Sequence, residues 1–144
     1  MAENPLEYFV VKPATSAPLN DLAKIYKDAG WWEPTFEQDL SFLDRIVKNS
    51  AVFVGAFAKK KMIGMGRALS DSISDAYIQD VAVRKRYRGQ GIGKKIIQRI
   101  IEELEKKGVD WIGLVAEPGT ASFYNDLGFE VLSGHTPLKY RGKK

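Results

Sequence analysis

Three glycines on alternate positions (Gly89, Gly91 and Gly93) separate an apolar stretch from a segment of helical spacing. We expect a strand before them, over residues 76–83, and an amphipathic helix after them, from Ile92 to Gly108. Glycines lack a Cβ atom, so the backbone N–H groups of such a turn can close around phosphate oxygens. The helix that follows directs the positive end of its dipole to the same place. This segment therefore predicts a strand–turn–helix unit with an anion site at its turn.

Positive charge is concentrated at the same turn. The chain of 144 residues has a net charge of +4, and seven of its 22 basic residues but none of its 18 acidic residues lie between Arg84 and Arg99. A local surplus of this kind indicates one anionic ligand rather than a generally basic surface. A nucleic-acid-binding domain is the weaker alternative, because Tyr87 is the only aromatic residue in the basic run and base stacking needs several.

Composition excludes several classes of chemistry. The chain has no cysteine and one histidine, His135, so it has no disulfide, no thiol nucleophile and no Cys/His zinc site, and we expect no metal. No apolar run approaches the ~20 residues of a membrane span, and the N-terminus has no signal-peptide layout. We therefore expect a cytoplasmic protein with neither a membrane nor a nucleic acid as its partner.

Length and periodicity predict a single domain over residues 1–144, with a core from about residue 6 to residue 140. The expected fold class is α/β (an α+β mixed sheet), a mixed sheet covered by helices in the order β-α-α-β-β-β-α-β-α-β-β. The expected strands are residues 8–12, 51–58, 62–69, 76–83, 111–116, 129–131 and 135–140. The expected helices begin at Leu19, at a capping box formed by Thr35 and Gln38, at Ile92 and at Thr120.

Two common phosphate-binding motifs do not fit the turn. A P-loop needs Ser or Thr after its lysine, whereas Lys94 is followed by Lys95. A dinucleotide-binding turn needs Gly-x-Gly-x-x-Gly, whereas the third glycine here comes one position too early.

The residues of the turn, Arg88-Gly-Gln-Gly91-Ile-Gly93, match the acyl-CoA signature Arg/Gln-x-x-Gly-x-Gly/Ala of the GCN5-related N-acetyltransferase (GNAT) family. The strand from Tyr77 to Val83 resembles the strand before that signature. Phe123-Tyr124-Asn-Asp-Leu-Gly128-Phe129 resembles the late helix motif of the family, Phe-Tyr-x-x-x-Gly-Phe, although Glu117 and Thr120 stand where the family often has Asn and Ala. The resemblance covers nearly the whole chain and implies the GNAT-like acyl-CoA N-acyltransferase fold, with acetyl-CoA as cosubstrate.

The resemblance also implies roles for residues. An acetyl group would pass directly to a primary amine, of a small molecule or a protein, within a ternary complex, and members of the family are frequently homodimers. Tyr124 would be the general acid, with Tyr77 and Gln79 as a proton relay or as holders of a water. The cofactor would lie against Val81, Ala82, Val83, Arg88, Gly89, Gln90, Gly91, Ile92, Gly93 and Lys94. The alternative within the same fold is a CoA-binding regulatory module without catalysis.

The acceptor side is less constrained by the sequence. Strand alternation places Tyr77, Gln79, Val81 and Val83 on one face and Asp80 and Ala82 on the other, so Asp80 reaches the site only if a bulge intervenes. Two tryptophans either line an acceptor pocket or cap the core, and loop acids either form an acidic mouth for a cationic amine or are simply solvated. These weaker candidates are Trp31, Trp32, Glu33, Asp71 and Glu117.

Overall fold

The computed structural model describes residues 6–10 and 18–143 and divides into two compact units, residues 1–113 and residues 114–144. The second unit contains one helix, α4 (Ala121–Asn125). The elements of the first unit are β1 (Glu7–Val10), α1 (Leu19–Asp28), the 3-10 helix η1 (Pro34–Gln38), α2 (Ser41–Lys48), β2 (Val52–Ala58), β3 (Lys61–Ser70), β4 (Asp75–Val83), the 3-10 helix η2 (Lys85–Tyr87), α3 (Ile92–Lys106) and β5 (Trp111–Gly113). The predicted mixed α/β fold class is confirmed, whereas the single-domain organisation stays a prediction.

The five strands form one sheet in sequence order, β1-β2-β3-β4-β5, in which β4 and β5 are parallel and the other pairs are antiparallel. The predicted hairpin of β2 and β3 is present. Its turn is tighter than expected, because Ala58 already pairs with Lys61 and only Lys59 and Lys60 remain in the connection, both with positive φ. Two residues of this backbone type match the right-handed twist of the flanking strands.

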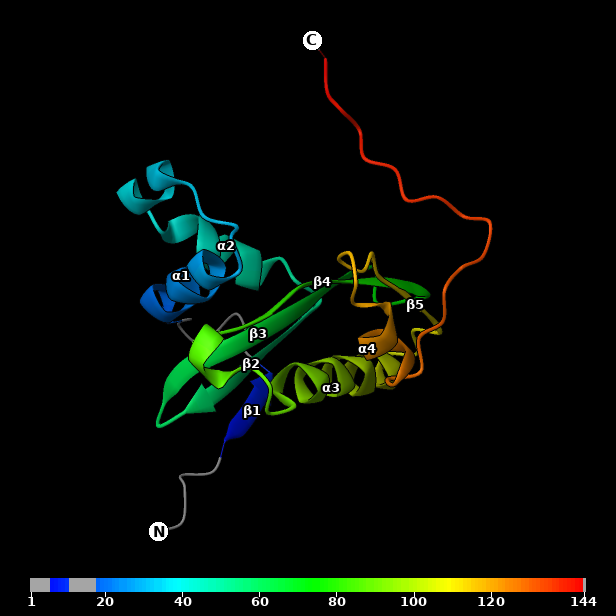
Figure 1. The fold of residues 1–144 in the computed structure, drawn as a ribbon, viewed down its shortest axis with the longest axis horizontal. Coiled ribbons are helices and arrows are strands. Elements are labelled where there is room, and N and C mark those ends of the chain that lie inside the picture. The colour runs from blue at the N-terminus through cyan, green and yellow to red at the C-terminus, as the bar shows by residue number, and fades with distance from the viewer. Residues whose placement is uncertain (1–5, 11–17, 144) are drawn as a thin grey trace. The chain divides into compact units, whose positions relative to one another are not determined.

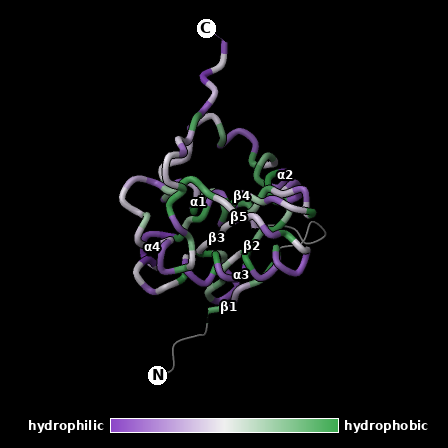
Figure 2. Tube along the Cα trace, turned by 90° about the vertical axis from the view of Figure 1, so that its right-hand side faces the viewer, coloured by the Kyte–Doolittle hydropathy of each residue, from purple (hydrophilic) through white to green (hydrophobic). Residues whose placement is uncertain are grey.

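Helices cover both faces of the sheet, with α1 and α2 on one side and α3 on the other (Figure 1). Leu22, Ile25 and Leu43 of the first layer bury their side chains on the sheet, and Ile96, Ile97, Ile100 and Leu104 of α3 do so on the opposite face. Figure 2 shows the hydrophobic residues gathered along the central strands and the hydrophilic ones along the connecting loops. No helix within residues 6–10 and 18–143 is both long and apolar enough to cross a membrane.

Two predicted element starts are wrong in detail. The capping box does not begin α2: Thr35 and Gln38 belong to η1, and α2 starts only at Ser41, whose N–H donates to the Asp39 carboxylate. A proline at the first position of η1 favours a short helical turn there, which ends before the amphipathic pattern begins. The first strand begins one residue early, and the part expected over residues 11–12 lies outside the described residues.

The last two predicted strands do not form. Residues 129–131 and 135–140 have no strand pairing, and β5 ends at Gly113 rather than at residue 116. The short apolar runs that suggested strands are exposed at Val131 and Leu138. A strand needs a partner strand whose N–H and C=O groups pair with its own. The described part of the second unit contains no strand.

Candidate functional site

The predicted anion site is a glycine turn at the start of α3. Gly89 and Gly91 both have φ +80, a left-handed conformation that glycine adopts without steric cost, and Gly91 is the N-cap of the helix. The first helical backbone bond runs from the Lys95 N–H to the Gly91 carbonyl. The amides of residues 92–94 therefore have no carbonyl partner in α3, as is usual for the first turn of a helix. Because neither glycine has a neighbour within 4 Å of its Cβ position, an anion can approach this backbone closely.

Asp28, at the end of α1, holds the loop before this turn. Its Oδ2 accepts hydrogen bonds from Arg84 Nε at 2.8 Å and from the Lys85 N–H at 2.9 Å, while its carbonyl accepts one from Arg88 Nη2 at 3.2 Å. The Lys85 N–H, followed by the Arg84 guanidinium, lowers the pKa of Asp28. The sequence analysis missed this residue, because only the fold brings α1 to a loop more than 50 residues away.

Arg88 binds main-chain carbonyls of the first unit. Its Nε donates to the Val83 carbonyl at 2.9 Å, and its Nη2 donates to that of Asp28. These two bonds tie the glycine turn to the end of β4 and to α1. Two of the five donors of a guanidinium are thereby engaged. The contact of Arg88 with phosphate, implied by the resemblance, stays a prediction.

The edge of β4 opens toward the same turn. Parallel pairing with β5 stops at Tyr77, opposite Gly113, so the strand from Ile78 to Val83 has no strand partner on that side among the described residues. The Arg84 N–H donates to the Ile63 carbonyl of β3 at 2.8 Å. Since main-chain groups alternate in direction along a strand, the N–H of Val83 points away from β3, toward the open edge.

A β-bulge in β4 changes which side chains share a face. Met65 pairs with Ala82 and Arg67 with Gln79, so two residues of β4, Asp80 and Val81, lie opposite one residue of β3. The expected alternation is therefore wrong from this point on.

Beyond the bulge, Val81 and Val83 lie with Ile96 of α3 around the glycines of β3. Ala82 instead joins the core under α1 and α2. On that same side, Asp80 is in contact with Arg67, the cross-strand partner of Gln79. The bulge thus brings Asp80 to the face of Gln79.

Tyr77 lies two residues before Gln79 on the same face. Its side chain is exposed and its ring packs against Trp111, with the ring centroids 5.3 Å apart. Gln79 is exposed as well. Both side chains are therefore accessible to solvent on the face that also carries Asp80, as a relay or a holder of water requires.

The two candidate tryptophans pack on the core under α1 and α2. The Trp31 ring meets Tyr26 edge-on at 5.7 Å, and the Trp32 ring contacts Phe36 at 5.3 Å and Phe42 at 6.1 Å. Both side chains are partly buried, so capping of the core is the role that the packing supports.

The loop acids of the first unit, Glu33 and Asp71, are exposed. Asp71 accepts hydrogen bonds from the N–H groups of Ser74 and Ile73, which lower its pKa in that order, and so organises its own loop. Glu33 is exposed before η1. No group of three or more His, Asp or Glu side chains placed to hold a metal ion occurs within residues 6–10 and 18–143. The expected acidic mouth stays a prediction.

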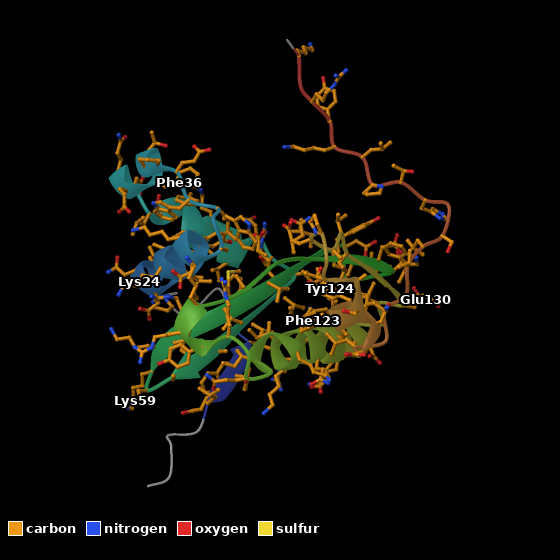
Figure 3. All side chains as sticks on the ribbon, in the orientation of Figure 1. Lys24, Phe36, Lys59, Phe123, Tyr124 and Glu130 are labelled. Atoms are coloured by element: carbon orange, nitrogen blue, oxygen red, sulfur yellow. The ribbon has the colours of Figure 1, made fainter. Side chains whose placement is uncertain are left out.

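Tyr124 belongs to the second unit. Figure 3 shows Phe123 and Tyr124 side by side on α4, with ring centroids 5.0 Å apart, and Phe129 meets Tyr124 edge-on at 5.9 Å. Burial, followed by the negative charge of Glu117, raises the pKa of the Tyr124 hydroxyl. The phenol therefore keeps its proton through the neutral range, as a general acid must.

A family model for the acetyltransferase (GNAT) family matches residues 19–129. A protein of Gracilaria tenuistipitata var. liui named uncharacterized N-acetyltransferase ycf52 is 33% identical over 77% of this chain and 61% of its own length. The Arabidopsis thaliana protein named GCN5-related N-acetyltransferase 2, chloroplastic, is 42% identical over 50% of this chain and 28% of that one. The chain thus spans less than two thirds of these relatives, 61% of the first.

Solved structures share the fold. The structure of a GNAT-family acetyltransferase from Streptococcus pneumoniae superposes with a TM-score of 0.80 over 97% of this chain and 100% of that one, at 22% sequence identity. At this identity the likeness concerns the fold alone. The expected GNAT-like architecture is therefore confirmed independently of the motifs that suggested it.

Proposed function

The chain belongs to the acetyltransferase (GNAT) family, and from this premise we propose that it transfers an acetyl group from acetyl-CoA to a primary amine within a ternary complex. The observation that carries the proposal is the open edge of β4 ending beside the glycine turn. The exposed main chain of a strand can pair with an extended amide chain, and the unpaired amides of a helix start can bind phosphate.

The described residues fit this cosubstrate. Open space over Gly89 and Gly91 leaves room for a diphosphate against the amides up to Lys94, whose exposed side chain adds a positive charge. The main chain of Val81 and Val83 would hold the pantetheine arm. Acetyl-CoA supplies the acetyl group as an activated thioester.

Residues of the chain would then assist the transfer. The Val83 N–H donates to the acetyl oxygen, where negative charge develops. Tyr124 donates its proton to the departing sulfur, a role supported by its raised pKa and by the motif it belongs to. Tyr77 and Gln79 guide the proton that leaves the amine, and Trp31, Trp32, Glu33, Asp71 and Glu117 are the candidates for contact with the acceptor.

Release of the CoA thiol in the presence of a panel of amines tests this function. A thiol-reactive dye suits the assay, because the chain has no cysteine and contributes no background. We expect thiol release that depends on both acetyl-CoA and an amine, with intersecting initial-rate lines. Release of one equivalent without an amine would instead indicate an acetylated enzyme and contradict direct transfer.

Binding of acetyl-CoA without any thiol release would favour the regulatory module. Absence of heat on titration with acetyl-CoA would contradict both proposals.

Two further proposals concern assembly and location. Sedimentation equilibrium tests the homodimer. The cytoplasmic location is tested by fractionation of the source cells, and it stays a prediction because two relatives are named chloroplastic.

A further inference from the structure

Asp80 has an unusual backbone for a residue within a strand. Its φ is +55, in the left-handed region, and it is one of the two residues that the bulge of β4 places opposite a single residue of β3. A residue other than glycine adopts this conformation at a cost, which asparagine and aspartate bear best. Such a conformation persists only where the surrounding structure holds it.

Two side chains from different elements hold the Asp80 carboxylate. Arg67 of β3 donates from Nε to Oδ2 at 2.7 Å, and the Tyr26 hydroxyl of α1 donates to the same oxygen at 3.1 Å. The Arg67 and Asp80 side chains are only 15% and 26% exposed, so water competes weakly for this ion pair. Burial, followed by the charge of Asp80, raises the pKa of Tyr26, which therefore remains a neutral donor.

The bulge determines the direction of the main chain that follows it. When the pairing register of a strand shifts by one residue, each later side chain points to the opposite face of the sheet, and each later N–H points to the opposite edge of the strand. With the bulge, Ala82 pairs with Met65 and lies in the core under α1 and α2. In the same register, the N–H of Val83 points to the open edge of β4, because the next N–H, of Arg84, bonds to β3.

We propose that Asp80, held by Arg67 and Tyr26, is a positioning residue that keeps the β4 bulge in place and thereby aims the Val83 N–H at the acetyl oxygen. The inference rests on the proposed acetyl transfer. It assigns no proton transfer to Asp80, although the Oδ1 atom accepts no hydrogen bond from the described residues. The competing role, in which Asp80 itself takes the proton of the amine, makes different predictions.

Three substitutions separate the two roles. Asn and Gly both tolerate the left-handed backbone without a carboxylate, whereas Ala does not. If the held side chain keeps the bulge, Asp80→Asn keeps most of the turnover, because its amide oxygen can still accept from Arg67 and Tyr26. Asp80→Gly tolerates the backbone but loses both contacts, so its kcat falls to an intermediate value, and Asp80→Ala lowers kcat by about 10²-fold, the usual loss for one oxyanion donor. The KM for acetyl-CoA changes much less than kcat, because the glycine turn is intact.

The pH profile is the second readout. A positioning role leaves the acidic limb of kcat/KM in Asp80→Asn where it is in the wild type. A carboxylate base predicts that this limb disappears and that Asn, Gly and Ala are equally inactive. Either of those results would overturn the proposal.

A matched control addresses nonspecific strain. Lys60 has φ +67 in the β2–β3 turn, so Lys60→Ala imposes the same kind of backbone penalty away from the site, and turnover should not change. Tyr26→Phe removes one donor to Asp80 without changing the sequence of β4, and we expect an intermediate loss of kcat. Unchanged kcat in folded Tyr26→Phe or in folded Asp80→Ala would refute the positioning role of Asp80, so one unstable variant still leaves a test.

A measurement without substrate separates this inference from the proposed function. The amide chemical shifts of residues 80–83 report the bulge whether or not any amine is acetylated. Shifts that move most in Asp80→Ala, less in Asp80→Gly and stay in place in Asp80→Asn support the positioning role of Asp80, whereas unchanged shifts in Asp80→Ala would overturn it. Failure of acetyl-CoA to bind the wild type would refute the proposed acetyl transfer, but the comparison of amide shifts among the Asp80 variants would still be valid.

Discussion

Substitution of Gly91 by alanine probes the glycine turn most directly. Gly91 begins α3 with φ +80, and a Cβ atom built on it meets nothing within 4 Å. The cost of the methyl group is therefore the left-handed backbone alone, about 1–2 kcal/mol for an L-residue. We expect the free energy of unfolding to decrease by about that amount, measured by urea denaturation.

The same substitution should weaken binding of acetyl-CoA. Strain at Gly91 displaces the amides of residues 92–94, which have no carbonyl partner in the helix. A hydrogen bond to a charged group contributes about 1.5–3 kcal/mol, so loss of one raises Kd at least tenfold. Isothermal titration calorimetry measures this change on protein that is folded at the chosen temperature.

Gly108 provides the matched control at the other end of the same helix. It has φ +86 and likewise no atom within 4 Å of its Cβ position, so Gly108→Ala should lose similar stability. Its distance along α3 from the turn means that the affinity for acetyl-CoA should remain that of the wild type. Equal Kd values for the two variants would refute the placement of the diphosphate at Gly91. Unchanged stability in both would refute the argument from backbone cost.

Three further outcomes are expected. Tyr124→Phe should lower kcat by about 10²-fold or more without raising the KM for acetyl-CoA. Because the pKa of Tyr124 is raised, deprotonation of this residue should not lower wild-type turnover at any pH below about 10. The pKa of Asp28 is lowered in the fold, so its contribution to stability is present above the unfolded value of ~3.9 and is lost as pH falls through the folded pKa. Urea midpoints of wild type and Asp28→Asn should therefore differ at pH 7 and approach each other as pH falls through the folded pKa. Leu104→Ala empties a fully buried position of α3 and should destabilise the protein by about 2–5 kcal/mol, whereas a loss below 1 kcal/mol in thermal or urea unfolding would show that the core there can collapse.

Prediction from the sequence succeeded where the signal was local. The spacing of isoleucines located α3 to within a residue or two, and the apolar runs around Lys59 and Lys60 located the hairpin. It failed at residues 129–140, because a short apolar run predicts a strand whether or not a partner strand exists.

The candidate site shows the same division. The glycine turn was predicted because glycine, charge and the start of a helix are adjacent in the chain. Asp28, Arg67 and Tyr26 were missed, since each acts on a residue at least 13 positions away. The face of Asp80 could be stated only conditionally for a related reason: a bulge adds one residue to the period, and no residue pattern in β4 predicts it.

The sequence by itself determined α3, the inner strands and the glycine turn, because these depend on periodicity and on residues that are neighbours along the chain. The tertiary structure decided the register of β4 beyond Gln79 and the fastening of the turn to α1. Both depend on contacts between elements that are distant in the sequence. The energies of these contacts depend on how side chains pack in space, so the spacing of residues along the chain does not predict them.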